Sequence, residues 1–216
     1  MNKIRIPNYS LSEELMNSIS HGVGAGLSIA GLVLLIIKSS NHHNGYALAG
    51  SLVYGISLIL LYTISCIYHG LSPKLKAKKV FRVIDHCNVF LLVAGTFTPI
   101  CLVAFNGVVG WIMFTLIWIV TIVGIVLNSI NIDKYQLASV LCHLTTGWSV
   151  LFILNNLTTN LGKTGLIFLL VGGIFYSIGA LLYWIGSKTK YMHSIFHFFC
   201  LAGSTFHYFL IFSFVI

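Results

Sequence analysis

Long apolar runs recur along the 216-residue chain, and short polar segments separate them. The hydrocarbon core of a bilayer is about 30 Å thick, so roughly 20 residues of α-helix, each rising about 1.5 Å, suffice to cross it. The pattern therefore predicts an all-α membrane protein, a bundle of seven transmembrane helices. The predicted spans cover residues 19–38, 46–69, 83–104, 108–128, 136–156, 163–184 and 192–215.

The composition excludes a soluble domain. Hydrophobic residues make up 57% of the chain and charged residues only 7%, whereas soluble domains are about a quarter charged. The connections are too short for a second domain, so residues 1–216 are expected to form one membrane domain, with residues 1–18 as a cytoplasmic segment. Within that segment, Ser10 followed by Glu13 predicts a capping box that begins a short helix ahead of the first span.

The charge distribution predicts the orientation in the membrane. The net charge is +8, and ten of the 12 Lys and Arg residues fall in the N-terminal tail or in the second, fourth and sixth connections. Because excess Lys and Arg marks cytoplasmic loops, we expect the N-terminus inside and the C-terminus outside. Basic residues grouped in this way indicate contact with anionic membrane lipids and argue against binding of nucleic acid.

Asp85 stands apart among the four acidic residues of the chain. Glu13, Glu14 and Asp133 fall in predicted tails or loops, whereas Asp85 lies at the cytoplasmic start of the third span. A charge at the centre of a bilayer costs about 2.5–3.5 kcal/mol, so an acid inside a span usually faces the bundle and has a partner. That partner is either Arg82, three residues earlier, or a polar site at the same depth.

Three histidines are predicted at the depth of Asp85. His69 ends the second span, and His193 and His197 lie in the first two turns of the seventh, so all three fall at the cytoplasmic end. The i, i+4 spacing places His193 and His197 on one helical face, with Cβ atoms about 5–6 Å apart. Two imidazoles so placed can bind one metal ion, and His69 or Asp85 is available as a third ligand.

Zinc is the expected cofactor, because imidazole suits Zn²⁺ and no Met or Cys cluster indicates copper or iron–sulfur. Three histidines leave a fourth position open, which is the arrangement of catalytic zinc sites. Asp85 is then the candidate for accepting a proton from bound water. Ser65, one turn before His69 on the same face, is the candidate for a hydrogen bond to that water or to a substrate oxygen.

Each of these assignments has a structural alternative. A histidine in a helix is more often a packed, hydrogen-bonded residue than a ligand, and a serine in a membrane helix commonly bonds to its own helix or to a neighbour. Cys66 and Cys200 each lie three residues from a candidate histidine and are rival ligands. The five cysteines, all in predicted spans and without a CxxC pair, are expected to be free packing residues.

Other polar residues in or near the spans are left without an assigned role. One helical face near the cytoplasmic end of the bundle carries Glu14, Asn17 and His21. These residues either position the first helix beneath the metal site or form a cap at the membrane interface. His143 and His207 lie inside the fifth and seventh spans, and for His207 a hydrogen bond to a neighbouring helix is favoured.

Five features follow one another along the chain: ELMNSISHGVGA (14–25), the pair Ser65 and His69, Asp85, GTFTP (95–99) and HSIFH (193–197). Together they resemble the hemolysin III family, the bacterial branch of the progestin and adipoQ receptor superfamily, which includes the adiponectin receptors. The resemblance covers essentially the whole chain. It implies a seven-helix bundle in the bacterial inner (plasma) membrane, with its N-terminus inside and a zinc ion on the cytoplasmic side.

The resemblance also implies which residues form the site. The zinc ligands of structurally known relatives match His69, His193 and His197, and the aspartate and serine beside the metal match Asp85 and Ser65.

Three functions are compatible with these features. The first is a zinc-dependent hydrolase that cleaves amide or ester bonds of membrane lipids, or a related membrane-homeostasis factor. The second is a pore-forming, cytolytic protein, and the third is a non-catalytic, receptor-like sensor with structural zinc. The sequence leaves protein partners undetermined and an oligomer open.

Overall fold

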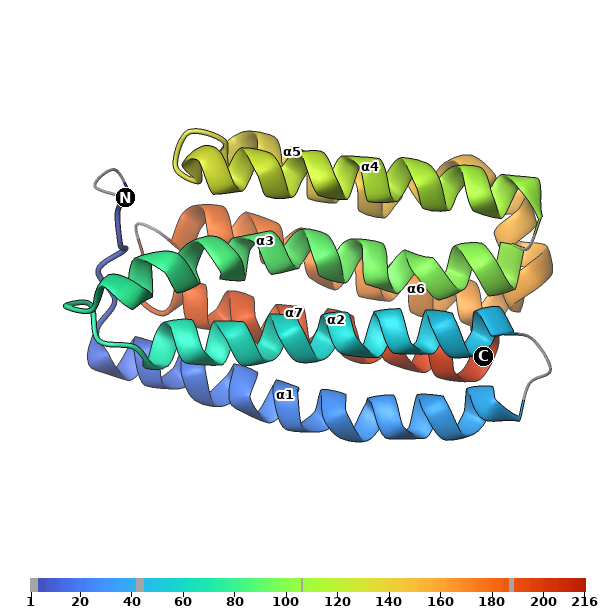
Figure 1. Cartoon of the computed structure of the whole chain (residues 1–216), viewed down its shortest axis with the longest axis horizontal. Coiled ribbons are helices and arrows are strands. Elements are labelled where there is room, and N and C mark those ends of the chain that lie inside the picture. Colours follow the sequence, from blue (N-terminus) through green and yellow to red (C-terminus); the bar gives the residue numbers. More distant parts are fainter. Residues whose placement is uncertain (1–3, 42–44, 106, 187–188) are drawn as a thin grey trace.

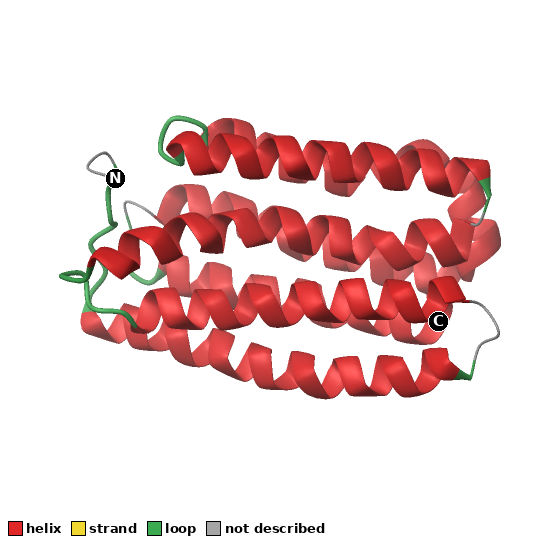
Figure 2. Cartoon of the chain, in the orientation of Figure 1, coloured by secondary structure: helices red, strands yellow, loops and turns green. Residues whose placement is uncertain are grey.

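The computed structural model describes residues 4–41, 45–105, 107–186 and 189–216, with the side chains of 152–157 outside the description. Within these residues the chain is helical and contains no strand (Figure 2). Seven α-helices are described, and short π-helical or 3₁₀-helical stretches (η1–η3) continue three of them. Their bounds are α1 Leu11–Ser40, α2 Gly45–Gly70, α3 Lys76–Pro99, η1 Ile100–Phe105, α4 Val108–Asn131, α5 Gln136–Trp148, η2 Ser149–Ile153, α6 Leu154–Gly186, α7 Met192–Leu210 and η3 Ile211–Val215.

The helices lie side by side along one long axis, and the N- and C-terminal ends are found at opposite ends of the bundle (Figure 1). Six of the seven predicted spans each lie within one described helix and its continuation, whereas the fifth, residues 136–156, runs through α5 and η2 into the start of α6. Six of the described helices are long and apolar enough to cross a membrane. The fifth predicted span differs, because α5 has 13 residues of α-helix, which rise only about 20 Å before the tighter η2 begins. The inside and outside assignment of the two ends stays a prediction.

The predicted capping box is present at the start of α1, but the separate short helix is not. The Ser10 backbone N–H donates to Glu13 Oε2 at 2.8 Å, and the Glu13 N–H donates to Ser10 Oγ. From Leu11 the helix continues without interruption to Ser40, because no proline interrupts this segment. One consequence is that Glu14, predicted in a tail, lies on the same rigid helix as the first span.

A glycine brings α1 close to two other helices. A Cβ atom on Gly24 would lie 2.9 Å from the Tyr62 ring of α2 and 2.8 Å from Leu201 of α7. Small residues let membrane helices approach closely. Close packing matters there because lipid provides no hydrophobic driving force for helix association. The contact fixes α1 against α2 and α7, and it sets the polar face of α1 beside the ends of both helices.

The distribution of side chains fits a hydrocarbon environment. Large apolar residues such as Leu27, Ile122 and Leu181 are more than half exposed, while polar residues such as Asn17 and Asn128 are buried. This arrangement is the reverse of that in a soluble domain, and it is expected where the solvent is lipid. All five cysteines are free, as predicted.

Candidate metal centre

The histidines at the ends of α2 and α7 come together in the fold. His69 occupies the last turn of α2, while His193 and His197 occupy the first two turns of α7. One ring nitrogen from each lies within 4.8 Å of the others, and all three side chains are buried. Across the helices, the His69 ring centroid is 4.8 Å from that of His197 and 5.3 Å from that of His193. The structure thus brings together the three predicted ligands.

The spacing of the nitrogen atoms fits a shared metal ion as well as a hydrogen bond between His193 and His197. His193 Nε2 and His197 Nε2 lie 3.2 Å apart, close to the roughly 3.3 Å that two ligands of a tetrahedral zinc ion would have. His69 Nε2 is buried and has no hydrogen-bond partner among the described residues. Burying such a nitrogen without a partner is costly, so an ion that accepted all three lone pairs would satisfy this group.

A carboxylate on α1 supports His69 from the other side of its ring. Glu14 Oε2 lies 2.6 Å from His69 Nδ1, and Asn17 Nδ2 lies 3.4 Å from the same nitrogen. The other Glu14 oxygen accepts from Lys78 Nζ at 2.6 Å, and Lys78 also donates to the Leu71 carbonyl at 2.8 Å. The prediction that Glu14 lies in a tail or loop is therefore wrong. Lys78, grouped with the basic loop residues, is fully buried.

His21 adds a fourth imidazole to this cluster. Its ring stacks on His197 with centroids 3.7 Å apart, and it meets Tyr62 edge-on at 4.9 Å. Both of its nitrogens lack a hydrogen-bond partner in the described part of the chain. The spacing of Glu14, Asn17 and His21 was the signal for this face of α1, which lies against the histidine cluster rather than forming an interfacial cap.

Asp85 and Ser65 lie on a cavity that also reaches the histidines. The cavity has a volume of about 190 Å³, and His193 and His197 form part of its wall. Ser65 of α2 and Asp85 of α3 both line this cavity. Neither residue belongs to the group of convergent ligand atoms, so Asp85 is beside that group and not in it.

Arg82 does not form the alternative ion pair with Asp85. Its Nη2 lies 2.9 Å from Asp133 Oδ1, and no salt bridge joins it to Asp85 among the described residues. Its Nη1 also donates to the backbone carbonyl of Arg5. These contacts tie the segment before α1 to the α4–α5 connection, because the Arg5 N–H donates to Asp133 at 3.2 Å.

The rival thiol ligands lie elsewhere. Cys66 contacts Ser18 on α1, and Cys200 lies on the cavity wall, one turn beyond His197. Within the described residues, the group of convergent ligands contains neither thiol.

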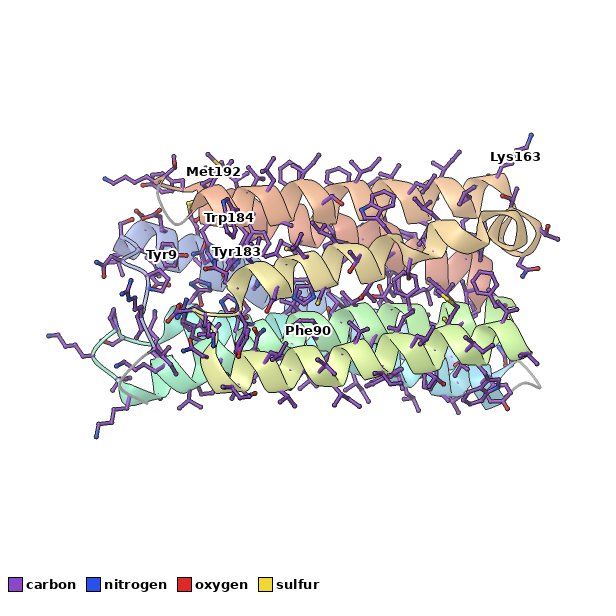
Figure 3. All side chains as sticks on the ribbon, turned by 90° about the horizontal axis from the view of Figure 1, so that it is seen from above. Tyr9, Phe90, Lys163, Tyr183, Trp184 and Met192 are labelled. Atoms are coloured by element: carbon purple, nitrogen blue, oxygen red, sulfur yellow. The ribbon has the colours of Figure 1, made fainter. Side chains whose placement is uncertain are left out.

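Tyr9 covers the histidines at the end of the bundle that carries the N-terminus. Its ring stacks on His193 at a centroid distance of 4.9 Å and an interplanar angle of 20°, and lies 6.0 Å from His69. Figure 3 shows Tyr9, Tyr183 and Met192 at this end and Lys163 at the opposite one. Burial raises the pKa of the Tyr9 phenol, which therefore stays neutral. Sequence reasoning missed this contact, because Tyr9 precedes the first helix.

The comparison with known proteins covers this whole arrangement. Residues 9–208 match the protein family described as "Haemolysin-III related". The chain belongs to the hemolysin III family. The matched range includes every residue of the histidine cluster, the cavity residues Asp85 and Ser65, and Tyr9.

Two bacterial relatives align with this chain along nearly their full length. Hemolysin-3 of Bacillus cereus is 37% identical over 206 residues, which cover 95% of this chain and 93% of the relative. A Hemolysin-3 homolog of Bacillus subtilis (strain 168) is 33% identical over 203 residues, 94% of each chain. The human monocyte to macrophage differentiation factor is a more distant relative, 22% identical over 170 residues, 76% of this chain and 69% of its own.

Family and fold together establish the setting of the site. The chain is a multi-pass integral membrane protein, and its bacterial hemolysin III relatives fit an inner-membrane location. His143 and His207, which the sequence left without a role, contact other residues than the cluster, and His42 and His43 lie outside the described residues. His207 Nε2 lies 3.2 Å from the Leu169 carbonyl of α6, the neighbour contact that was favoured, and His143 packs on the Phe90 ring at 3.8 Å.

Proposed function

We propose that this protein is a zinc-dependent hydrolase that cleaves an amide or ester bond of a membrane lipid. One observation carries the proposal: three buried imidazoles converge within 4.8 Å beside a cavity that presents a carboxylate and a hydroxyl. Three protein ligands with an open fourth position are the pattern of catalytic zinc sites.

Zinc is preferred because of the donor set. The convergent atoms are three imidazole nitrogens, and the group contains no thiolate or carboxylate among the described residues. Imidazole suits zinc, whereas carboxylate and carbonyl oxygens suit magnesium or calcium. His69, His193 and His197 would hold the ion.

The remaining steps belong to residues of the chain. A zinc ion would acidify a water molecule and polarise the carbonyl of the scissile bond. Asp85 would accept a proton from that water and return it to the departing amine or alcohol, so that one water is consumed for each bond cleaved. Ser65 would donate a hydrogen bond to that water or to a substrate oxygen, and apolar cavity residues such as Val93 and Phe97 would hold the acyl chain and exclude other water.

The test combines metal content and turnover in the same samples. Purified wild-type protein and the His69→Ala, His193→Ala and His197→Ala variants would be analysed for zinc and incubated with lipid amides and esters. We expect about one zinc per wild-type chain, its loss in each variant, and lipid cleavage only where zinc is present. His207→Asn, which can still donate to the Leu169 carbonyl, is the control for metal content. Wild-type protein without metal would contradict the proposal.

A sensor with structural zinc is the second candidate, and the contacts of Glu14 favour it. Through Glu14 and His69 the centre joins α1 to α2, and through His193 and His197 it joins both to α7. An ion in this position would hold three helices together without turnover. In that case chelation lowers the melting temperature while lipid cleavage is absent from fully zinc-loaded protein.

The names of the two Bacillus relatives suggest a cytolytic function as a third candidate. It predicts release of a trapped dye from liposomes by purified protein, with the same rate for wild type and His69→Ala. A release rate that falls with loss of the metal centre would instead connect membrane damage to catalysis.

A further inference from the structure

Glu14 connects the candidate metal centre to a buried cation on another helix. Its Oε2 lies 2.6 Å from His69 Nδ1, and its Oε1 lies 2.6 Å from Lys78 Nζ. The side chains of His69 and Lys78 are 0% exposed, and that of Glu14 is 12% exposed. Both carboxylate oxygens are therefore used, one toward the imidazole of α2 and one toward the ammonium of α3.

This arrangement determines which nitrogen of His69 is free. A carboxylate held by a lysine ammonium is an acceptor only, so the nitrogen that faces it has to carry the hydrogen. The hydrogen on Nδ1 leaves the lone pair of Nε2 available, and Nε2 is the buried nitrogen without a partner in the described part of the chain. The contact thus selects the tautomer that a metal ion requires.

The other two candidate ligands have no carboxylate behind them. Nδ1 of His193 and Nδ1 of His197 are buried, and among the described residues only the backbone of Asn17 lies beside the His197 ring as a possible support. His69 is also the one candidate ligand that comes from α2, so its orientation decides whether the site closes. A residue that fixes the His69 ring is placed to control the affinity of the whole centre.

We propose that Glu14 is a positioning residue of the metal centre, which accepts the Nδ1–H of His69 and aims Nε2 at the ion, with Lys78 holding the carboxylate in place. This inference rests on the proposed metal binding. Carboxylates behind metal-binding histidines fix the ring and raise its basicity, and their removal typically weakens metal affinity 10–100-fold.

The neighbouring residue provides a matched control. Glu13 has the same side chain and lies in the same helical turn, but its oxygens accept from the Tyr191 backbone N–H at 2.7 Å and from Ser10. Among the described residues no hydrogen bond joins Glu13 to a histidine nitrogen, and Glu13 is buried. Removing its charge disturbs the same end of α1 without changing the support of His69.

The experiment measures zinc affinity of the full-length protein in detergent micelles by competition with a chromophoric chelator. Glu14→Gln keeps the size of the side chain, but its amide presents a donor to either the imidazole N–H or the Lys78 ammonium. We expect about 10–100-fold weaker zinc binding for Glu14→Gln and wild-type affinity for Glu13→Gln. Glu14→Asp, which keeps the charge but is shorter, should show an intermediate loss. With Co²⁺ in place of zinc, the visible absorption bands of Glu14→Gln should shift while those of Glu13→Gln should not.

The outcomes separate this inference from the proposed function. Zinc binding by wild type that is lost in His69→Ala, together with wild-type affinity in the folded Glu14 variants, would overturn the role of Glu14 alone. Equal weakening in Glu13→Gln and Glu14→Gln would also overturn it, because the effect would then be a general one of this end of the helix. Failure of wild-type protein to bind zinc at all would overturn both.

Discussion

Replacing Lys78 by methionine tests the buried ion pair behind the candidate metal centre. Methionine keeps most of the side-chain volume and removes the charge that faces Glu14 at 2.6 Å. Removing one partner of a fully buried pair costs about 3–5 kcal/mol, because it leaves an uncompensated charge. Glu14 retains its contact with His69 and is 12% exposed, so we expect a smaller cost, about 2–3 kcal/mol.

The loss should appear as a lower melting temperature of the purified protein in detergent. For a chain of this size 1 kcal/mol corresponds to about 2–4 °C, so Lys78→Met is expected to melt about 4–12 °C below wild type. Lys76→Met is the matched control, since Lys76 lies two residues earlier in α3 and is exposed. It should melt within about 2 °C of wild type.

A double variant separates the pair from the site around it. In Glu14→Gln/Lys78→Met no charge is left uncompensated, so its loss of stability should be smaller than the sum of the two single losses, with a coupling of about 1–3 kcal/mol. Equal melting temperatures for Lys78→Met and Lys76→Met would refute the reasoning, as would strictly additive losses in the double variant.

Three further predictions concern helix packing, access and metal removal. Gly24→Ala should lower the free energy of unfolding by about 1–3 kcal/mol, because its Cβ would lie only 2.9 Å from the Tyr62 ring. Gly26 has open space around it, so Gly26→Ala should be neutral or slightly stabilising in thermal melts. Tyr9→Ala should speed removal of bound metal by a chelator roughly fivefold, because about 1 kcal/mol of stacking on His193 is lost. Tyr9→Phe should keep the wild-type rate of metal removal. Equal rates for all three proteins would contradict a covering role of Tyr9. Chelation should lower the melting temperature of zinc-loaded wild-type protein. The loss is equivalent to about 4 kcal/mol of stability if zinc is present at a thousand times its dissociation constant. The melting temperature of His193→Ala should not change, and an unchanged wild-type melting temperature would count against metal binding.

Much of the fold and the core of the site could be predicted because both depend on position along a helix. The apolar runs located the long helices, although the described helices start up to nine residues before the predicted spans and the fifth predicted span is divided among α5, η2 and the start of α6. The alternation of span directions brought His69 to the level of His193 and His197 before any contact was known. The spacing of four residues in HSIFH then placed two rings on one face of α7. No further information was needed to expect three imidazoles at one end of the bundle.

The supporting residues could not be predicted because their partners come from tertiary packing. Lys78 stands among exposed lysines in the sequence, and only the close approach of α1 turns it inward to Glu14. Arg82 likewise has an acid three residues away, yet it pairs with Asp133 from a connection far along the chain. Tyr9 precedes the first helix, where hydrophobic periodicity carries no signal, and its ring nevertheless lies on His193.

The candidate ligands lie far apart in the sequence, and this separation has a consequence for biosynthesis. His69 leaves the ribosome some 124 residues before His193, which at about 5–20 residues per second is a delay of roughly 6–25 s. During that interval Glu14 and His69 can already pair in the membrane, while the nitrogens from α7 do not yet exist. A metal ion held by all three imidazoles would therefore bind only after α7 has been synthesised and has packed against α2.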